Sequence, residues 1–583
     1  MKPRLLALPP LFCLTLLTLS TVARAESAPP NPLRLMPADT DFIVEAHNPR
    51  QFIDALKTLD AVEGFLKLEV VREFYDSTTA HRLYQLLAYF EKELGAKWPE
   101  LLDQIGGGGA VLGVKIGPQP APALLVVQGK DEAKVKKSVL LGLQVLEGEI
   151  ARQESKDKLE KAEYRHVETY RIGTQFHAAV VGSALLIANQ EKALQGGIDL
   201  HLDGDKKSLV NNNNVTEARK LLPSEPLAMA WLNLETVRKA PGAKDVFTLP
   251  RNDANLTIAF GQYLDLASRS PYVCAGLCRK DKELLLTVRV PRGREGMTEE
   301  LALHIAPEDK TPCLPLLEPR SVIYSSSAFF DLGKFWEQRE KLFNKEQVKA
   351  FEDFEKNSGR FLAGTPISKL LTQAGPYQRF VVACQNKTGY KTASKLPLPA
   401  FAFVVDMRDA EAFPKTMDTV LRGVALLAGS QAGLKLVEEK HGDHTLVGYR
   451  FPEDKPLKQD TNDLRFNFSP CFIAVGNQFL ICSTLELGHE LIDLLEKQAK
   501  DPLAKVPYSS MQRFYSVGGA EYMKSFEDFF LTQTILSQAA TPASAKAQVK
   551  AFFQWVRGLG TADIEYDYGQ KESRIDIRLT PPK

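Results

Sequence analysis

The feature that most constrains the fold of this chain is an internal repeat, in which blocks of the same kind recur in one order, 269 to 294 positions apart. Residues 101–106 match residues 370–375 as a short helix that ends at a glycine. Residues 178–187 match residues 472–481 as two apolar runs around a Gly-Ser or Gly-Asn turn, which is typical of a tight hairpin. Because the blocks keep their order, the sequence predicts two halves that share one fold.

Each half opens with a strand and continues with a helix. In the first half the strand lies within residues 36–44, after which Asn48 is expected to cap a helix that Pro49 starts. In the second half the strand lies within residues 317–324, and Asp331 is expected to cap the helix. The order of strand, cap and helix therefore occurs twice.

Longer helices and further strands follow in both halves. Apolar residues at a spacing near 3.6 predict helices over residues 79–94 and 345–357. Further strands are predicted at residues 123–127, 284–290, 401–405 and 573–579. Helices lie between groups of strands rather than after every strand, which indicates an α+β fold. We expect two related halves, each a largely antiparallel sheet of hairpins with helices packed on one face.

The length of 583 residues is enough for two large domains. We expect a signal peptide at residues 1–25 and a short linker at 26–34. The first α+β repeat then covers residues 35–291, a second linker covers 292–316, and the second α+β repeat covers 317–583. The second boundary is placed where a Pro-Arg-Gly-Arg-Glu-Gly segment leads into a proline-bearing stretch.

The first residues have the pattern of a secretory signal peptide. Lys2 and Arg4 precede an apolar stretch over residues 5–19, and an Ala-Arg-Ala sequence ending at Ala25 forms a cleavage site. The alternative, an uncleaved membrane anchor, is disfavoured because the apolar stretch is short for a bilayer and contains two prolines. We expect cleavage after Ala25 and a secreted or periplasmic protein that begins at Glu26.

Charge and composition exclude several classes of protein. Hydrophobic residues form 44% and charged residues 25% of the chain, as in soluble globular proteins. Removal of residues 1–25 takes away Lys2, Arg4 and Arg24 and no acidic residue, so the net charge changes from +1 to −2. A nearly neutral chain has no general attraction for nucleic acid or anionic lipid. No later segment reaches about 18 uninterrupted apolar residues, so no membrane span is expected after signal removal.

Two of the six cysteines that follow the signal peptide are expected to face each other. If residues 476 and 477 form a two-residue turn, Cys471 pairs with Cys482, within the range of a disulfide. Free thiols buried in the sheet are the alternative. Cys274 and Cys278 lie four residues apart in one strand, roughly 13 Å at about 3.3 Å per residue, which is too far for a bond between them.

The motifs that could carry chemistry are few. His441, Asp443 and His444 are weak candidates for a metal site, because their flanks predict a hairpin whose turn they form. The glycine run at residues 106–109 is followed by a strand rather than by Lys-Ser/Thr and a helix, so it predicts a turn and not a phosphate loop. No catalytic residue can be assigned, and no cofactor is expected. The four tryptophans are predicted to be core anchors rather than a carbohydrate platform.

Several short blocks resemble a known family. These blocks are residues 37–40 (Pro-Ala-Asp-Thr), 101–103, the hairpin at 181–182, 208–210 and 221–223. They resemble the exported bacterial proteins grouped as a domain of unknown function, which open with a Pro-Ala-Asp-Thr strand. The resemblance covers most of residues 34–290 and, more loosely, the second half. It implies a bacterial source and a repeated plan of hairpins and helices, and it supplies no catalytic residues.

Three hypotheses for the function follow. The first is a non-enzymatic binding or structural module of the cell envelope, with an unknown protein or envelope component as its partner. The second is a secreted hydrolase whose site lies at the interface of the two halves, where ligand pockets often occur. The third is a metal-binding protein that uses His441, Asp443 and His444.

Overall fold

A computed structural model describes residues 30–582 except 153–156, 252, 361, 386–388, 456, 458–459 and 502–505. The predicted signal peptide and its cleavage after Ala25 lie outside the described residues. The described chain has an α+β fold, as the sequence predicts.

The strands pair into one antiparallel sheet of 20 strands. The first half supplies β1 (Phe42–Ala46), β2 (Ala110–Val114), β3 (Ala123–Gln128), β4 (Leu159–Tyr164), β5 (Val167–Ile172), β6 (Phe176–Val181), β7 (Ala184–Ala188), β8 (Ala228–Asn233), β9 (Tyr272–Lys280) and β10 (Glu283–Pro291). The second half supplies β11 (Val322–Phe329), β12 (Ala374–Ala383), β13 (Ala400–Met407), β14 (Lys435–His441), β15 (His444–Arg450), β16 (Cys471–Val475), β17 (Gln478–Cys482), β18 (Ser510–Tyr515), β19 (Thr561–Tyr568) and β20 (Glu572–Thr580).

The two halves have the same strand order. Pairing runs β4-β5-β6-β7-β3-β2-β1-β8-β9-β10 in the first half and β14-β15-β16-β17-β13-β12-β11-β18-β19-β20 in the second. β10 pairs with β20 and joins the halves. The halves are therefore related by a pseudo-two-fold axis that is perpendicular to the sheet and lies between these two strands.

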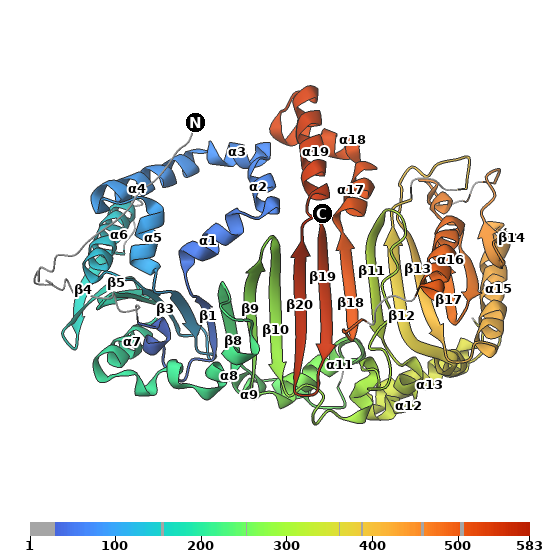
Figure 1. The fold of residues 1–583 in the computed structure, drawn as a ribbon, viewed down its shortest axis with the longest axis horizontal. Helices are drawn as coiled ribbons and strands as arrows, with labels where there is room; N and C mark the ends of the chain where they lie inside the picture. The colour runs from blue at the N-terminus through green and yellow to red at the C-terminus, as the bar shows by residue number, and fades with distance from the viewer. Residues whose placement is uncertain are drawn as a thin grey trace, which may run out of the picture.

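The helices follow the same symmetry. The first half contains α1 (Pro49–Lys57), α2 (Asp60–Leu66), α3 (Glu69–Tyr75), α4 (Thr78–Leu94), α5 (Trp98–Gly106), α6 (Glu132–Arg152), α7 (Glu191–Asp203), α8 (Asn213–Leu221), α9 (Leu234–Lys239), α10 (Ala243–Phe247) and α11 (Ala254–Arg269). The second half contains α12 (Leu332–Leu342), α13 (Lys345–Ser358), α14 (Ile367–Gln373), α15 (Ala412–Ala432), α16 (Leu485–Lys500), α17 (Ser516–Lys524), α18 (Glu527–Gln538) and α19 (Pro542–Arg557). In Figure 1, α1–α5 at the upper left correspond to α12 and α13 at the lower right, and α9 and α11 below the sheet correspond to α17–α19 above it.

The local signals in the sequence have the predicted effect. The side chain of Asn48 accepts a hydrogen bond from the backbone of Gln51, and the side chain of Asp331 accepts one from the backbone of Lys334. Gly182 and Gly476 have φ of +55°, a left-handed conformation that suits a tight hairpin turn. These glycines connect β6 to β7 and β16 to β17, so both predicted hairpins are confirmed.

The outer strands of each half carry helices on both faces, which corrects the expected packing on one face. Leu194 and Ile198 of α7 join a core with Leu186, whereas Leu143 of α6 packs over Ile187, the next residue of the same strand. In the second half α16 and α15 cover opposite faces in the same way. Successive strand residues point to opposite sides, and both sides are apolar here, so each side needs a helix.

The segments expected to be linkers contribute to the core. Leu33, in the stretch assigned as the first linker, is 1% exposed. The second linker contains the 3₁₀ helix η4 (Glu299–His304), whose Leu301 and Leu303 are buried against Phe343 at the end of α12. The second linker thus fastens the second half to α11 of the first half.

A second contact between the halves is made by α2 of the first half with α19 of the second half. The indole Nε1 of Trp555 on α19 donates a hydrogen bond to the carbonyl oxygen of Ala61 at 2.8 Å, and the ring of Phe65 lies 5.6 Å from the indole. Each half therefore reaches across the axis to the other. Among the residues that the structure describes, no helix has the length and apolar character needed to cross a bilayer.

Candidate functional site

One face of the sheet is apolar and open through its centre. Strand register places seven large apolar side chains on this face, and each is 37–49% exposed. They are Val44, Leu112, Leu286, Phe401, Phe403, Phe514 and Leu579. We call this face the apolar floor. In spatial order it is formed by β2, β1, β8, β9, β10, β20, β19, β18, β11, β12 and β13. It extends roughly 50 Å across the central strands at about 4.8 Å per strand.

The second half of the apolar floor carries a cluster of rings, which we call the aromatic ladder. It consists of Tyr324, Phe380, Phe401, Phe403 and Phe514. The ring centroids of Phe380 and Phe403 lie 4.7 Å apart, and those of Tyr324 and Phe514 lie 4.8 Å apart. A distance of 6.2 Å between Tyr324 and Phe380 joins the two pairs. Four neighbouring strands thus supply a continuous aromatic surface.

The aromatic ladder is a property of one half. The common strand register gives each of its residues a counterpart in the first half: Phe42, Leu112, Ala123, Leu125 and Leu232. Four of these five positions are aliphatic. The repeated fold does not require the rings, because the first half folds without them. Their enrichment in the second half therefore indicates a specialised surface.

Helices surround the apolar floor. Gly106 at the end of α5 lies against Val127, and α6 covers the strands beyond it. On the other side Val420 and Met417 of α15 pack beside Val405. At one end of the strands Tyr263 of α11 contacts Tyr566, with ring centroids 5.8 Å apart. The apolar floor is thus the bottom of a walled basin.

A pocket of about 400 Å³ lies at the other end of the strands. Leu284, Phe514 and Leu579 extend the apolar floor into it, while Ala61 of α2 and Leu559 after α19 close its sides. A mostly apolar pocket of this size is typical of a small-molecule site. Because Phe514 belongs both to the aromatic ladder and to the pocket, the two form one continuous surface.

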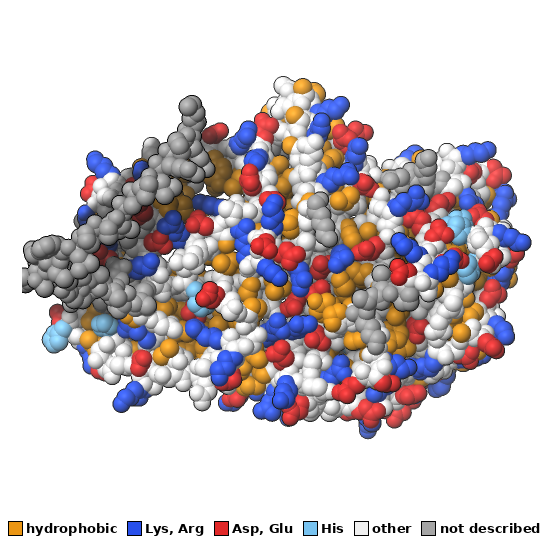
Figure 2. All heavy atoms as spheres, viewed as in Figure 1, with side chains coloured by type: hydrophobic (Ala, Val, Ile, Leu, Met, Phe, Trp, Pro, Cys, Tyr) orange, Lys and Arg blue, Asp and Glu red, His pale blue; other side chains and the backbone are white. Residues whose placement is uncertain are grey.

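The opposite face of the central strands is charged. Figure 2 shows this face, with acidic and basic side chains gathered over the middle of the sheet. Arg513 forms a short hydrogen bond to Asp563, and Arg578 donates to Glu565 at 3.3 Å. A pocket of about 460 Å³ lies among these residues and Glu283. It lies at the interface of the halves, where the hydrolase hypothesis expects a site.

Two of the carboxylates of this polar pocket, those of Asp563 and Glu565, are already partnered by arginines. Asp563 and Glu565 are each 5% exposed. Burial raises the pKa of Glu565, while a hydrogen bond from Tyr508 and the charge of Arg578 act in the opposite direction. Asp563 forms an ion pair with Arg513. Burial lowers the pKa of Arg513, but the hydrogen bond and the charge of Asp563 raise it, and the pKa lies above its usual value. Carboxylates fixed in ion pairs are poorly placed to exchange protons with a substrate.

The histidines predicted as metal candidates lie in a hairpin. His441 faces His444 across the turn that contains Asp443. His441 Nε2 lies 2.7 Å from Asp493 Oδ1, and His444 Nε2 lies 3.1 Å from Glu496 Oε1, so both imidazoles bind to α16. No set of three or more His, Cys, Asp and Glu side chains within the described ranges is placed to hold a metal ion.

The cysteine pair has the predicted register. Cys471 faces Cys482 across β16 and β17, and both thiols are buried and free. A hydrogen bond with the thiol of Cys482, together with burial, raises the pKa of Cys471 well above its usual value. Cys274 and Cys278 are also free. The disulfide between Cys471 and Cys482 stays a prediction.

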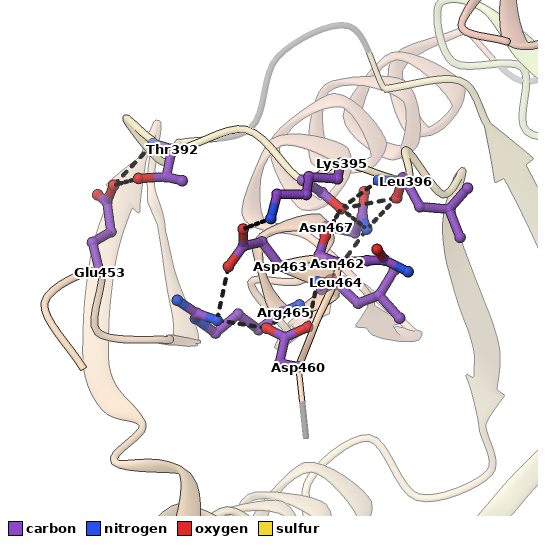
Figure 3. A network of polar contacts seen from close by, with 11 residues as sticks. Thr392, Lys395, Leu396, Glu453, Asp460, Asn462, Asp463, Leu464, Arg465 and Asn467 are labelled. Atoms are coloured by element: carbon purple, nitrogen blue, oxygen red, sulfur yellow. Dashed lines mark hydrogen bonds and ion pairs between the residues drawn. The ribbon is translucent and has the colours of Figure 1, made fainter. Parts of the chain in front are cut away.

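The long loops of the second half form a polar network, which Figure 3 shows. Asp460 accepts a hydrogen bond from Arg465 at 2.6 Å, and the same guanidinium lies 3.3 Å from Asp463. Glu453 accepts hydrogen bonds from the backbone and hydroxyl of Thr392 at 3.0 and 3.1 Å. The contacts of Glu453 join one loop to the other, and those of Arg465 hold the second loop in shape.

Sequence reasoning missed the aromatic ladder. Its signal is present in residues 400–403, where alanine and phenylalanine alternate, so that one face of the strand is aromatic and the other is small. Trp231 and Trp336 are buried, as expected of core anchors. An apolar run does not by itself reveal which face of a strand is covered.

Comparisons with known proteins add little to this description. No family model matches the chain, and no curated protein matches it. Crystal forms I, III and IV of TP0453 align with it at TM-scores of 0.24, 0.23 and 0.24 and sequence identities of 8%, 7% and 9%. The alignments cover 46%, 47% and 46% of this chain and 82%, 84% and 83% of the TP0453 chains.

Proposed function

We propose that this protein is an exported, non-enzymatic binding module that holds the hydrocarbon chain of a ligand on its apolar floor. The observation that carries the proposal is the open aromatic ladder. Monomeric soluble proteins rarely expose a large contiguous apolar surface unless that surface binds something. The ladder is absent from the first half, so the common fold does not account for it.

The tilt of the rings supports a flexible chain as the ligand. Neighbouring rings of the ladder are inclined by 40° between Phe380 and Phe403, 55° between Tyr324 and Phe380 and 51° between Tyr324 and Phe514. A platform for sugar rings or bases needs aromatic faces that lie flat. A hydrocarbon chain bends and fills the hollows between tilted rings. The walls of the basin also favour a slender ligand over a second sheet.

The envelope location and the family remain part of the proposal. The pattern of Lys2, Arg4 and Ala25 supports export. Two of the blocks that resemble the exported bacterial family, residues 37–40 and 208–210, meet in the fold, since Pro37 bridges to Ser208 and the backbone of Leu209 donates to Met36 at 2.7 Å. A shared structural corner is consistent with such a family. The ion pairs that fix Asp563 and Glu565 in the polar pocket favour binding over the alternative of hydrolysis.

The test uses diphenylhexatriene, an uncharged hydrocarbon dye that fluoresces in apolar surroundings. We expect saturable binding to the full chain, weakened about tenfold by Phe403→Ser and by Phe514→Ser, because each loses more than 1 kcal/mol of apolar contact. Phe354→Ser is the matched control, because Phe354 is a phenylalanine that is 54% exposed on α13 and belongs neither to the strands of the apolar floor nor to the aromatic ladder. Equal loss of binding in the control, or no binding to the unmodified chain, would exclude the proposal.

A further inference from the structure

The polar pocket lies on the face opposite the apolar floor, at positions where the two halves carry different residues. In the first half Trp231 faces Cys274, and both belong to the core beneath α8. In the second half the same two positions hold Arg513 and Asp563. A fully buried apolar pair has thus been replaced by an ion pair.

The cover over these positions differs as well. In the first half a side chain added at Gly276 would meet Leu222, which follows α8 and closes the surface. The counterpart of Gly276 is Glu565, and its side chain borders the open pocket. No helix equivalent to α8 is present between α16 and β18 in the residues that the structure describes. The second half therefore exposes buried charges to a pocket where the first half has packed core.

Two charged side chains of opposite sign line the pocket from different halves. Arg578 forms an ion pair with Glu565 on one side, interacts with Tyr508, and lines the pocket. Glu283, from the first half, borders the same pocket, and it has no ion pair within the described part of the chain. Leu285 is the residue that directly faces Arg578, so Glu283 is a diagonal neighbour of Arg578 on the same face. Diagonal positions of this kind lie roughly 7–8 Å apart.

We propose that this pocket binds a small zwitterion of the α-amino-acid class, with its carboxylate on Arg578 and its ammonium group on Glu283. Both side chains line the same pocket of about 460 Å³, and charge-assisted hydrogen bonds of about 2.8 Å would hold the ligand's carboxylate and ammonium group there. Val517, Pro581 and Pro582 form the apolar part of the lining, which suits an aliphatic side chain. Asp563 and Glu565 hold the two arginines in position.

The experiment compares three ligands on the full chain by isothermal titration calorimetry. L-Leucine carries both charges, 4-methylpentanoate lacks the ammonium group, and 3-methylbutylamine lacks the carboxylate. We expect saturable binding of leucine and affinities about tenfold or more lower for each analogue, because each leaves one charged residue without its partner. An analogue that binds as tightly as leucine, or no saturable binding of leucine, would overturn the proposal.

Variants then locate the binding. Arg578→Gln and Glu283→Gln should each weaken leucine binding about tenfold or more. Glu572→Gln is the matched control, because Glu572 is the counterpart of Glu283 in the second half and lies outside the pocket. Leucine binding that is unchanged in both pocket variants would contradict the assignment. The ligand comparison needs no variant, so a misfolded variant does not obscure the result, and dye binding to the apolar floor on the other face is an independent measurement.

Discussion

The hydroxyl of Thr287 donates a hydrogen bond to Asp576 Oδ1 at 2.5 Å, and the two residues occupy the same position in the two halves. They face each other at the middle of the pairing between β10 and β20. A residue that pairs with its own counterpart must lie on the pseudo-two-fold axis. The two halves are thus joined at their centre of symmetry through a buried contact.

Replacing Thr287 with valine should destabilise the protein by about 1–3 kcal/mol, since the buried carboxylate of Asp576 loses its nearest donor. Arg289 and Arg574 lie 3.8 and 3.9 Å from Asp576 and compensate in part. Urea denaturation measures the change. Thr287→Ser keeps the hydroxyl and should remain close to the unmodified protein; equal losses in both variants would assign the effect to the methyl group instead.

The repeat and its turns were accessible from the sequence because they depend on local signals. Glycine at a turn, an Asx cap and an alternating strand each act over a few residues, as at Gly476 and Asn48. The joining of both halves into one sheet was not accessible, because an edge strand and a central strand such as β10 have the same apolar pattern. The sequence also did not reveal whether helices cover one face of the outer strands or both faces.

Cys471 and Cys482 should form a disulfide when the protein folds in an oxidising compartment, because they face each other in register. Cys274 and Cys278, four residues apart along one strand, should stay free. Peptide mapping without reduction identifies the bond. Alkylation of both Cys471 and Cys482 in unreduced, unfolded protein would refute it. Cys471→Ser should then leave Cys482 open to alkylation after unfolding.

The loop network should lose stability in acid. Burial disfavours the charge of Asp460, but hydrogen bonds from Arg465 and from the backbone of Leu464 lower the pKa of its carboxyl below the usual value. A lowered pKa in the folded state means that the contribution is complete above the pKa of the unfolded chain and is lost as the pH falls toward the folded value. Denaturation between about pH 3 and pH 6 measures this loss.

Asp460→Asn provides the comparison for that measurement. At neutral pH it should cost about 1–3 kcal/mol, because Arg465 keeps its buried charge with only the more distant carboxylate of Asp463. The variant should also lose less stability than the unmodified chain on acidification. Glu453→Gln, on the exposed side of the same network, is the control and should change the acid response much less. An unaltered acid response in Asp460→Asn would contradict the assignment.

The two pockets could not be derived from the sequence because each depends on contacts between distant segments. Phe514 and Phe403 are more than a hundred residues apart, and only the order of β13, β12, β11 and β18 brings their rings into one surface. Arg578 and Glu283 belong to different halves and become neighbours through β10 and β20. Strand order is a property of the whole chain, whereas spacing within a motif is local.

The most direct test of the central claim is photo-cross-linking with an alkyl diazirine, an uncharged hydrocarbon that inserts where it is bound. Peptide mapping should find the adducts on the aromatic ladder, at Tyr324, Phe380, Phe403 and Phe514, and excess decanol should suppress them. Adducts mainly on Phe74 and Leu83, which are 62% and 65% exposed on α3 and α4, would contradict it. In that case the open apolar floor would not be the site that holds a hydrocarbon chain.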